Sequence, residues 1–505
     1  AAIESYQQAI NIQPENADAY LNIAAIQQNI GDLDGAITNF QQVIKLKPEC
    51  ESSLVQKLHL QAHICDWASL AENRKNVHNL GTSHQRVDPF ALLEMEDAPL
   101  RHRLRSEVFA STCRPEEQLS LSSKPIRKPK RLRIGYFSAD FHNHATMYLM
   151  AKLFESHDPT KFKIYAYSFG PDKSDEMRQR LVKAVDFFRD VRKNSDKAIA
   201  QLAQKDKIDI AVDLKGYTQL ARPCIFSYRA APIQISYLGY PGTSGSACMD
   251  YIIADKVVIP KSFETSYSES IIHLPHSYQV NDNTRIISES IPTRLEVGLP
   301  ENGFVFCCFN SNYKISPSEF NIWMHLLREV KGSVLWLLKS NQRAEHNLRT
   351  EAESRGISAN RLVFAEPISQ AKHLARLRLA DLFIDTFNYN AHTTASDALW
   401  AGLPIITKLG KGFAARVAGS LLEAIDLPEL ITETEQDYQA LILKLATDPK
   451  QLIEIKRKLT FNLLSKPLFN TELFTKHLEN GYQQAYDRYF DDKKPKKINV
   501  PVNLS

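Results

Sequence analysis

The sequence lacks long apolar runs, a secretory signal and a large net charge. No stretch approaches the roughly 18 consecutive apolar residues that cross a bilayer, which argues against a membrane protein. A formal net charge of +4 over 505 residues gives no indication that nucleic acid or a membrane surface is a partner. The chain opens Ala-Ala-Ile-Glu without a methionine, so we expect that upstream sequence is missing. These absences predict a cytoplasmic globular protein.

Cysteine is also scarce, because the chain has seven, without a CxxC pair or a metal-ligand spacing. Most lie in apolar runs such as FVFCCF (304–309), where a thiol packs as a small hydrophobic side chain. The single Asp-x-Asp sequence (32–34) lies in a predicted turn, where solvated carboxylates are a sufficient explanation. The cysteine pattern therefore gives no indication of a metal site and fits a reducing cytoplasm.

An internal repeat occupies the first 50 residues. AIESYQQAINIQP (2–14) returns as AITNFQQVIKLKP (36–48), at an offset of 34 residues. This period, with its alanine, aromatic and proline positions, is typical of the tetratricopeptide repeat, a helix pair that stacks into a solenoid. The alternative is a generic helical hairpin. Because so few repeats would not be stable alone, we predict that residues 1–50 belong to a longer array or pack on the next domain.

A helical transition and linker follow at 51–130, ending in the basic, proline-broken run SSKPIRKPKR (122–131). We interpret this run as a solvated entry to the next domain rather than a site for an acidic partner. Short apolar, β-branched runs then alternate with helical patterns, which predicts parallel sheets covered on both faces. The runs form two series, at 131–138, 162–169, 208–214, 233–240 and 250–255, then at 304–310, 333–339, 361–366, 381–386 and 403–408.

Two doubly wound α/β domains are therefore expected, at 131–300 and 301–470. A C-terminal helix at 471–490 and a disordered tail at 491–505 complete the predicted organisation. In such sheets ligands bind beyond the carboxyl ends of the strands. The chemistry is therefore expected in the loops that follow each strand.

One of these loops lies in FIDTFNYNAHTTASDALWAG (383–402), where a buried strand is followed by a helix that begins at about Thr393. The first N–H groups of a helix lack internal partners, and its dipole makes that end positive. Two threonine hydroxyls add donors at the same point, so this helix start suits a phosphate group. The alternative is that Thr393 is only an N-cap, with Asp397 in the first turn.

Several long motifs, in this order, resemble the protein O-GlcNAc transferase family. They are HICDW (63–67), RLRIGYFSADFHNHATMYLM (131–150), LGYPGTSGSACMDYIIAD (238–255), CCFNSNYKISP (307–317), LADLFIDTFNYNAHTTASDALWAG (379–402) and PLFNTELFTKHLENGYQQAY (467–486). The resemblance implies tetratricopeptide repeats joined to a GT-B glycosyltransferase with two Rossmann-like domains. It implies transfer of N-acetylglucosamine from UDP-GlcNAc to serine or threonine hydroxyls of proteins, with inversion and without a metal.

The same resemblance places most donor contacts in the C-terminal domain. Lys314 would neutralise the diphosphate together with the helix start at 392–394, His373 and Arg376 would contact uracil and ribose, and Asp397 would hold the ribose hydroxyls. Ser311 and Gln370 stand where relatives often have longer or charged groups, which predicts a weaker or slightly different nucleotide pocket. The implied donor-binding residues of this domain are Ser311, Lys314, Ile368, Gln370, His373, Arg376, His392, Thr393, Thr394 and Asp397.

In the N-terminal domain, the resemblance implies that His144 faces the cleft, as a general base or as a group that positions the sugar. Gly242 and Thr243 are expected to form a tight loop near the sugar and the diphosphate. Asp206 and Asp209 are secondary candidates near a proposed proton acceptor, and Asp209 stands where family members have a histidine.

Three functions remain open at this point. The first is a UDP-GlcNAc-dependent protein O-glycosyltransferase whose repeat groove presents acceptor proteins, with self-association through the repeats. The second is a repeat scaffold with an inactive transferase half, against which the retained Lys314, His144 and HTT sequence argue. The third is a transferase of the same fold that uses GDP-fucose or UDP-glucose, or asparagine as the acceptor. The related SPINDLY branch uses GDP-fucose, and this chain differs from it at 242–244 and 392–402.

Overall fold

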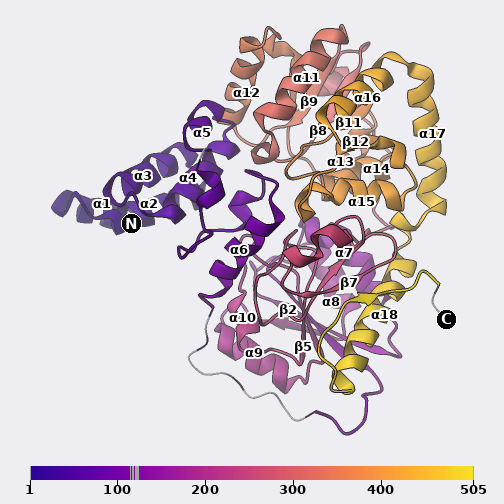
Figure 1. The fold of residues 1–505 in the computed structure, drawn as a ribbon. Helices are drawn as coiled ribbons and strands as arrows, with labels where there is room; N and C mark the ends of the chain where they lie inside the picture. Colours follow the sequence, from indigo (N-terminus) through magenta and orange to yellow (C-terminus); the bar gives the residue numbers. More distant parts are fainter. Residues whose placement is uncertain (1, 75, 114, 116–118, 120–123, 504–505) are drawn as a thin grey trace.

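The computed structural model describes residues 2–74, 76–113, 115, 119 and 124–503 of the chain. A helical N-terminal part projects from two α/β domains that lie one above the other in Figure 1. The last long helix returns from the upper domain to the lower one. Positions 122–123 of the predicted basic linker lie outside the described residues.

The N-terminal helices confirm the predicted tetratricopeptide fold. Each packs on the next one along the chain, and Gly31, with a φ of +84°, ends the second helix in the left-handed conformation that glycine adopts without strain. Ala24, Ala36 and Phe40 are almost fully buried between them. The helices are α1 (Ala2–Ile12), α2 (Ala17–Ile30), α3 (Leu33–Leu46) and α4 (Glu51–His63).

The transition region fixes this short array to the C-terminal domain. Trp67 packs edge-on against Phe320 with a centroid distance of 5.0 Å, and Asn341 and Asn347 donate to the carbonyls of His63 and Ile64. The array is therefore supported by the domain beside it, one of the two arrangements that the sequence predicts. The elements here are α5 (Trp67–Arg74), η1 (Val77–Asn79), η2 (Phe90–Leu92) and α6 (Pro99–Ala110).

The N-terminal α/β domain is built on an eight-stranded parallel sheet in the order β14-β7-β6-β5-β4-β1-β2-β3. Its central strands are buried on both faces, as expected of a parallel sheet between helices. Its strands are β1 (Leu132–Ser138), β2 (Phe162–Ser168), β3 (Phe187–Asp190), β4 (Ile210–Asp213), β5 (Ile233–Ser236), β6 (Tyr251–Ala254) and β7 (Ser270–His273). Its helices are α7 (Ala145–Ser156), α8 (Glu176–Ala184), α9 (Asp196–Lys205), α10 (Cys224–Ser227) and η3 (Lys261–Ser266).

The C-terminal α/β domain has a six-stranded sheet in the order β10-β9-β8-β11-β12-β13, with parallel pairing throughout. Its strands are β8 (Val305–Cys308), β9 (Val334–Leu338), β10 (Leu362–Ala365), β11 (Leu382–Ile384), β12 (Ile405–Lys408) and β13 (Ile431–Thr432). Its helices are η4 (Leu295–Val297), η5 (Asn312–Lys314), α11 (Pro317–Glu329), α12 (Gln342–Ser354), η6 (Ala359–Arg361), α13 (Gln370–Leu377), α14 (Thr393–Trp400), η7 (Phe413–Ala415), α15 (Val417–Ala424), η8 (Pro428–Leu430), α16 (Glu435–Thr447), α17 (Pro449–Ser465) and η9 (Pro467–Phe469).

The end of the chain differs from the prediction. Helix α18 (Thr471–Phe490) packs on the N-terminal domain, where the hydroxyls of Tyr482 and Tyr136 lie 3.3 Å apart. The predicted disordered tail is wrong for its described part, because β14 (Ile498–Asn499) pairs in parallel with β7 and the Ile498 side chain is buried. The strand was not recognised in the sequence because it is short and follows a charged run. Residues 504–505 lie outside the described residues.

Two of the seven cysteines are paired, which the sequence did not predict, whereas Cys65, Cys307 and Cys308 are free and buried, as expected of thiols that pack as small hydrophobic side chains. Cys113, after α6, forms a disulfide with Cys224 at the start of α10. The partners are 111 residues apart, so no local spacing could reveal them. Disulfides are rare in reducing compartments, so this pair gives no support to a cytoplasmic location, which stays a prediction.

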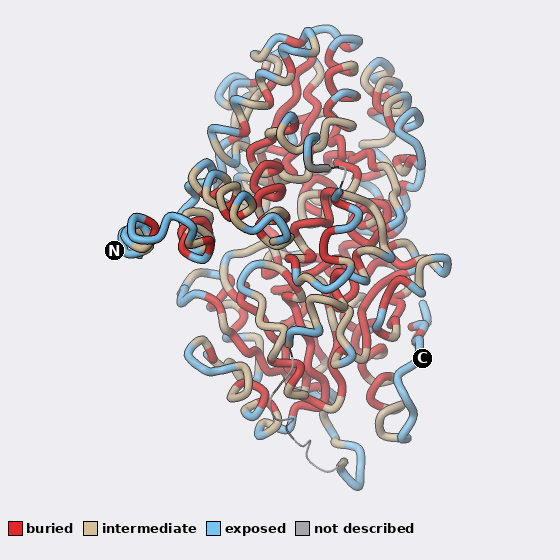
Figure 2. The backbone as a smooth tube through the Cα atoms, turned by 60° about the vertical axis from the view of Figure 1, so that its left-hand side comes forward, coloured by how far each residue is buried: buried red, intermediate tan, exposed pale blue. Residues whose placement is uncertain are grey.

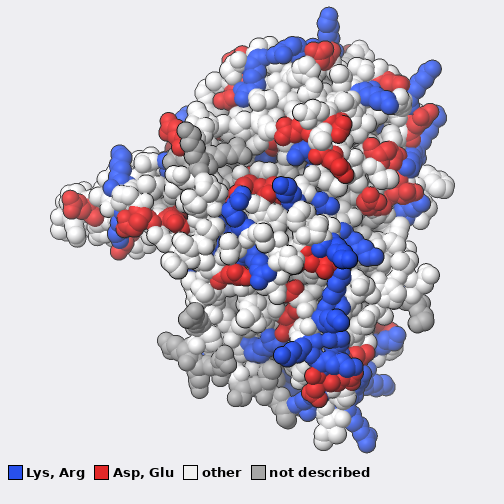
Figure 3. Space-filling model, viewed as in Figure 1, with Lys and Arg blue, Asp and Glu red and all other residues white. Residues whose placement is uncertain are grey.

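Figure 2 shows that the buried residues concentrate in the two α/β domains, while the projecting N-terminal end of the chain has fewer of them. Figure 3 shows acidic and basic side chains interspersed over much of one face, with a run of Lys and Arg over the lower domain. Several basic side chains beside the end of α18 have acidic partners, such as Lys128, whose Nζ lies 2.6 Å from Asp487 Oδ1. Among the described residues, no helix combines the length and apolar character that crossing a membrane requires.

Candidate functional site

Each sheet has a switch point, at which the order of its strands reverses direction. In the C-terminal sheet, β9 and β10 follow β8 on one side, whereas β11, β12 and β13 lie on its other side. The strand order therefore reverses between β8 and β11. Ligands in doubly wound folds bind at such a switch point, beyond the carboxyl ends of the two strands. The loops after β8 and β11 carry residues 309–314 and 385–392, which include Ser311, Lys314 and His392 of the predicted site.

Asp385 is the centre of the loop after β11. Its carboxylate accepts hydrogen bonds from the Ala391 N–H at 2.7 Å and the Thr407 hydroxyl at 2.7 Å, and from Asn310 Nδ2 at 3.0 Å. The side chain is fully buried, and burial raises its pKa to about 6. Asp385 therefore ties the β8 and β11 loops together and shapes the turn into α14. Sequence reasoning missed this role, although an aspartate directly after a buried apolar strand was the available signal.

The start of α14 is the predicted helix mouth. Thr393 is the first helical residue, so the N-cap position belongs to His392 and not to Thr393. The Thr394 hydroxyl donates to Asn310 Oδ1 at 2.5 Å, which joins the helix start to the β8 loop. His392 Nε2 lies 3.1 Å from the Ala414 carbonyl, so Nε2 carries the proton. Burial and the nearby Lys314 lower the pKa of His392 well below its usual value, which keeps the imidazole neutral.

Lys314 lies beside this helix mouth, at the end of η5. Its Nζ donates to the Asn390 carbonyl at 3.0 Å and lies 3.8 Å from the centre of the Tyr389 ring. Burial lowers the pKa of Lys314 to about 8, while Asp385, among other groups, opposes the shift. The ammonium group therefore remains mostly protonated near pH 7 and is poorly solvated, which strengthens its attraction for an anion.

The residues predicted to contact the nucleoside also lie close together, near the middle of α14. Asp397 Oδ1 accepts from Gln370 Nε2 at 3.2 Å, and Asp397 Oδ2 lies 3.9 Å from His373 Nε2. His373 Nδ1 accepts from Arg376 Nη2 at 2.9 Å, and the Arg376 guanidinium lies 4.9 Å from the Phe309 ring centre. Burial lowers the pKa of His373 to about 4, so this ring is neutral. The arrangement offers a flat imidazole beside a carboxylate.

Ile368 and Ser311 complete the predicted set in this domain. The Ile368 side chain is 44% exposed and precedes α13, and Ser311 precedes η5. An exposed isoleucine beside a polar crevice can cover the face of a planar ring. Neither residue has a charged side chain, so neither adds to the attraction that Lys314 exerts on anions.

His144 follows β1 in the N-terminal sheet and is the N-cap of α7. Its Nδ1 accepts the Thr146 backbone N–H at 3.2 Å, and the Asp140 carboxylate lies 3.6 Å from the same nitrogen, beyond hydrogen-bond distance. Because an N–H can only donate, Nδ1 carries the lone pair and Nε2 carries the proton of the neutral ring. Burial, the largest effect, lowers the pKa of His144, and Lys215 and His142 act in the same direction, while Asp140 opposes them.

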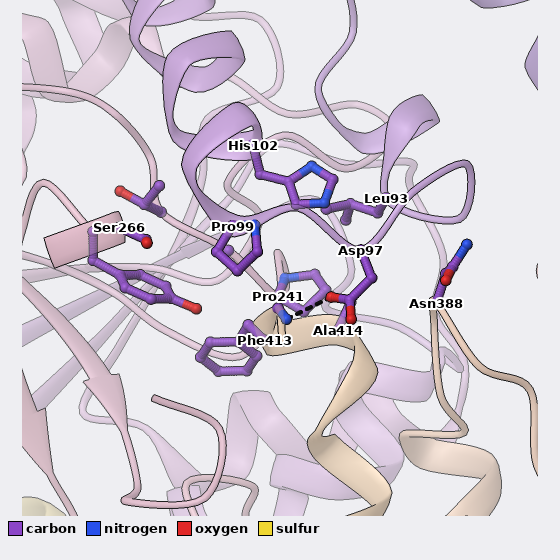
Figure 4. A pocket seen from close by; sticks show the side chains of 13 residues that line it. Leu93, Asp97, Pro99, His102, Pro241, Ser266, Asn388, Phe413 and Ala414 are labelled. Atoms are coloured by element: carbon purple, nitrogen blue, oxygen red, sulfur yellow. Dashed lines mark hydrogen bonds between the residues drawn. The ribbon is translucent and has the colours of Figure 1, made fainter. Parts of the chain in front are cut away.

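Figure 4 shows a small pocket where the transition region and the two α/β domains meet. Gly242 and Thr243 line it together with Asn388 and Ala414, whereas Lys314 and Asp397 do not. The Thr243 hydroxyl donates to Glu269 Oε2 at 2.5 Å, and the Thr243 side chain is almost fully buried. This hydroxyl therefore holds its own loop in place, and the loop borders the candidate site.

Asp206 and Asp209 do not belong to the site. Asp209 precedes β4 and pairs with Arg133 at 2.8 Å, at the amino end of β1, and Asp206 pairs with Arg189 at 2.9 Å. His144 lies at the opposite, carboxyl end of β1. The structure therefore does not bring these secondary candidates to the carboxyl edge of the sheet, where His144 lies.

Comparison with known proteins gives consistent matches over most of the chain. The family described as glycosyl transferase family 41 matches residues 112–291 and 287–478, and tetratricopeptide repeats match residues 1–31 and 17–50. An Arabidopsis thaliana protein named as a probable UDP-N-acetylglucosamine–peptide N-acetylglucosaminyltransferase, SEC, is 36% identical over 426 residues, which cover 83% of this chain and 43% of that protein. A Hordeum vulgare protein of the same name with the designation SPINDLY is 31% identical, over 72% of this chain and 39% of that protein.

Among solved structures, an O-GlcNAc transferase variant from Thermobaculum terrenum matches with a TM-score of 0.79 and 25% identity, covering 97% of this chain and 94% of that one. The chain spans less than half the length of the curated relatives described above.

Proposed function

The chain belongs to glycosyl transferase family 41, and on this basis we propose that it transfers N-acetylglucosamine from UDP-GlcNAc to serine or threonine hydroxyls of proteins. The observation that carries the proposal is the meeting of Lys314 with the start of α14 at the switch point of the C-terminal sheet. We propose that the tetratricopeptide repeats present the acceptor protein.

Departure of UDP leaves negative charge on the diphosphate, and a poorly solvated cation with free helix N–H groups stabilises such charge. Lys314 and the first turn of α14 would supply both from one sheet edge. The proposed mechanism uses these groups and no metal ion. His373, Gln370 and Asp397 would hold the nucleoside farther along α14.

The proposed role of His144 follows from its capping bond. With Nδ1 accepting the Thr146 N–H, the neutral ring presents an Nε2–H donor to the crevice. Such a ring donates a hydrogen bond to the sugar or the acceptor and does not remove a proton. Of the two roles expected from the sequence, positioning is therefore the one that we propose.

The proposal is tested by incubating the protein with an acceptor and UDP-GlcNAc, UDP-glucose or GDP-fucose, while nucleotide release and the intact mass of the acceptor are measured. We expect UDP release and a hexosamine increment with UDP-GlcNAc, unchanged by EDTA. A deoxyhexose or hexose increment would assign another donor, and turnover lost on chelation would contradict the metal-independent mechanism. Absence of turnover with all three donors would support an inactive scaffold.

The affinity for UDP is expected to fall as the pH rises above about 8. The Nζ group of Lys314 is protonated below its pKa of about 8 and loses its charge above it, so the attraction for the diphosphate is present at lower pH and is lost at higher pH. Calorimetric titration between about pH 7 and about pH 10 should show an affinity that declines up to about tenfold per pH unit. Lys314→Met, a variant of similar length, should bind weakly with little pH dependence. A wild-type affinity that stays constant to the upper limit would contradict this prediction.

A further inference from the structure

The segment between the two sheets contacts α14 directly. It follows β7 and carries Gln279, whose Nε2 donates to the Ser396 hydroxyl at 2.7 Å, and Arg285, which reaches the next residue of α14, Asp397. Both contacts join the connection after the N-terminal sheet to the helix that carries the candidate site. No sequence motif points to a role for this segment.

Arg285 is buried and held from several sides. Its side chain is 4% exposed, its Nη1 donates to Asp397 Oδ1, and its Nε donates to the Asp282 carbonyl at 3.2 Å. Its own carbonyl accepts from Trp400 Nε1 at 3.2 Å. Asp282 is in turn paired with Arg180 of α8 at 2.6 Å. A chain of contacts therefore runs from the N-terminal domain through Arg285 to Asp397.

The two oxygens of Asp397 have different surroundings. Oδ1 accepts from both Arg285 and Gln370, whereas the nearest charged or titratable group to Oδ2 is His373 Nε2, at 3.9 Å. One oxygen is anchored and the other is left without a close hydrogen-bond partner among the described residues. In addition, Arg285 Nη2 is buried and has no hydrogen-bond partner in the described part of the chain. A buried donor of this kind is costly unless a ligand satisfies it.

Charge gives a second argument. Asp397 is 6% exposed, and a carboxylate so deeply buried requires a cation or several donors nearby. Gln370 and the neutral His373 provide no positive charge, so Arg285 is the basic side chain that pairs with Asp397 at hydrogen-bond distance among the described residues.

We propose that Arg285 is a positioning residue of the donor site, which fixes Asp397 so that its free oxygen accepts the hydroxyls of the ribose of UDP. This inference rests on the proposed function, because it assumes that UDP occupies the crevice beside α14. The cation comes from the inter-sheet segment and not from α13, so nucleoside recognition involves both α/β domains.

The test compares UDP with 2′,3′-dideoxy-UDP, which keeps the base and the diphosphate but lacks the ribose hydroxyls. The wild-type protein should bind UDP at least about tenfold more tightly, since hydrogen bonds to a charged group are strong. Arg285→Gln should lower the UDP affinity by about tenfold and leave the affinity for the dideoxy analogue within about twofold, because only the hydroxyl contacts depend on Asp397. Arg285→Lys, which keeps the charge but not the forked geometry, should retain part of the discrimination.

Arg294→Gln is the matched control. Arg294 lies in the same segment and pairs with Asp381 at 2.9 Å, away from Asp397, so its replacement should leave the discrimination between the two nucleotides unchanged. Thermal unfolding of each variant shows whether it folds. If Arg285→Gln does not fold, Arg285→Lys carries the test, because a merely structural arginine would affect both nucleotides equally.

The outcomes separate the two proposals. A wild-type protein that binds neither nucleotide would overturn the proposed function. A wild-type protein that discriminates, together with an Arg285 variant that discriminates equally well or loses both ligands to the same extent, would overturn the role of Arg285 and leave the proposed function standing.

Discussion

Replacement of Lys314 by alanine is expected to lower kcat/KM for UDP-GlcNAc by about 100-fold to about 1000-fold, the range seen when a single group that stabilises developing negative charge is removed. Lys314 Nζ is the cation that reaches the Asn390 carbonyl, beside the first turn of α14. Its loss leaves the helix N–H groups alone to stabilise the departing diphosphate. Initial rates of UDP release with a saturating acceptor provide the measurement.

The fold should survive this change, because Lys314 is half-buried and its side-chain hydrogen bond goes to the backbone carbonyl of Asn390. Lys339→Met is the control, since Lys339 forms an exposed pair with Glu366 at 2.5 Å and should keep near-normal turnover. Near-normal rates in Lys314→Ala, measured with protein of unchanged thermal stability, would remove the charge-neutralisation argument.

Replacement of Asp385 by alanine is expected to cost about 4 kcal/mol of stability, because it leaves several buried donors without an acceptor. The Ala391 N–H, the Thr407 hydroxyl and Asn310 Nδ2 all donate to this carboxylate. The loss corresponds to a fall of about 10 °C in the unfolding temperature of the C-terminal domain. Differential scanning calorimetry measures this shift.

Activity should fall further than stability alone explains, since Asp385 fixes the loop that leads to the start of α14. Asp172→Ala tests the specificity of the effect, because Asp172 is 73% exposed in its pair with Arg192 and should change stability by less than about 1 kcal/mol. Equal shifts in both variants would show that Asp385 does not organise the two loops.

The long apolar strands were predictable because their pattern is local. The runs at 131–138 and 333–339 correspond to β1 and β9 within one or two residues, since a buried parallel strand is continuously apolar. Four strands were missed, namely β3, β7, β13 and β14. All are short and lie at or next to an edge of their sheet, where polar residues are tolerated. Their pairing depends on neighbours far along the chain.

The residues of the candidate site also fall into two groups, those that a local motif reveals and those that depend on contacts between distant segments. Lys314 and the helix start at Thr393 were identified from motifs that lie within a few residues of a strand end. Asp206 and Asp209 were misplaced because a sequence does not show at which end of a parallel sheet a residue lies when its strand boundaries are inexact. Arg285 was missed because its role depends on a contact with Asp397, which is 112 positions away in the sequence.

The sequence alone determined the alternation of strands and helices, the repeat period and the family resemblance, because these depend on residue patterns within tens of positions. The tertiary structure decided which groups touch: the anchoring of Asp397 by Arg285, the Asp385 contacts that join two loops, the disulfide and the docking of β14. The physical reason is that burial and hydrogen bonding between distant segments depend on how the strands are ordered in the sheet. Local propensity does not encode that order.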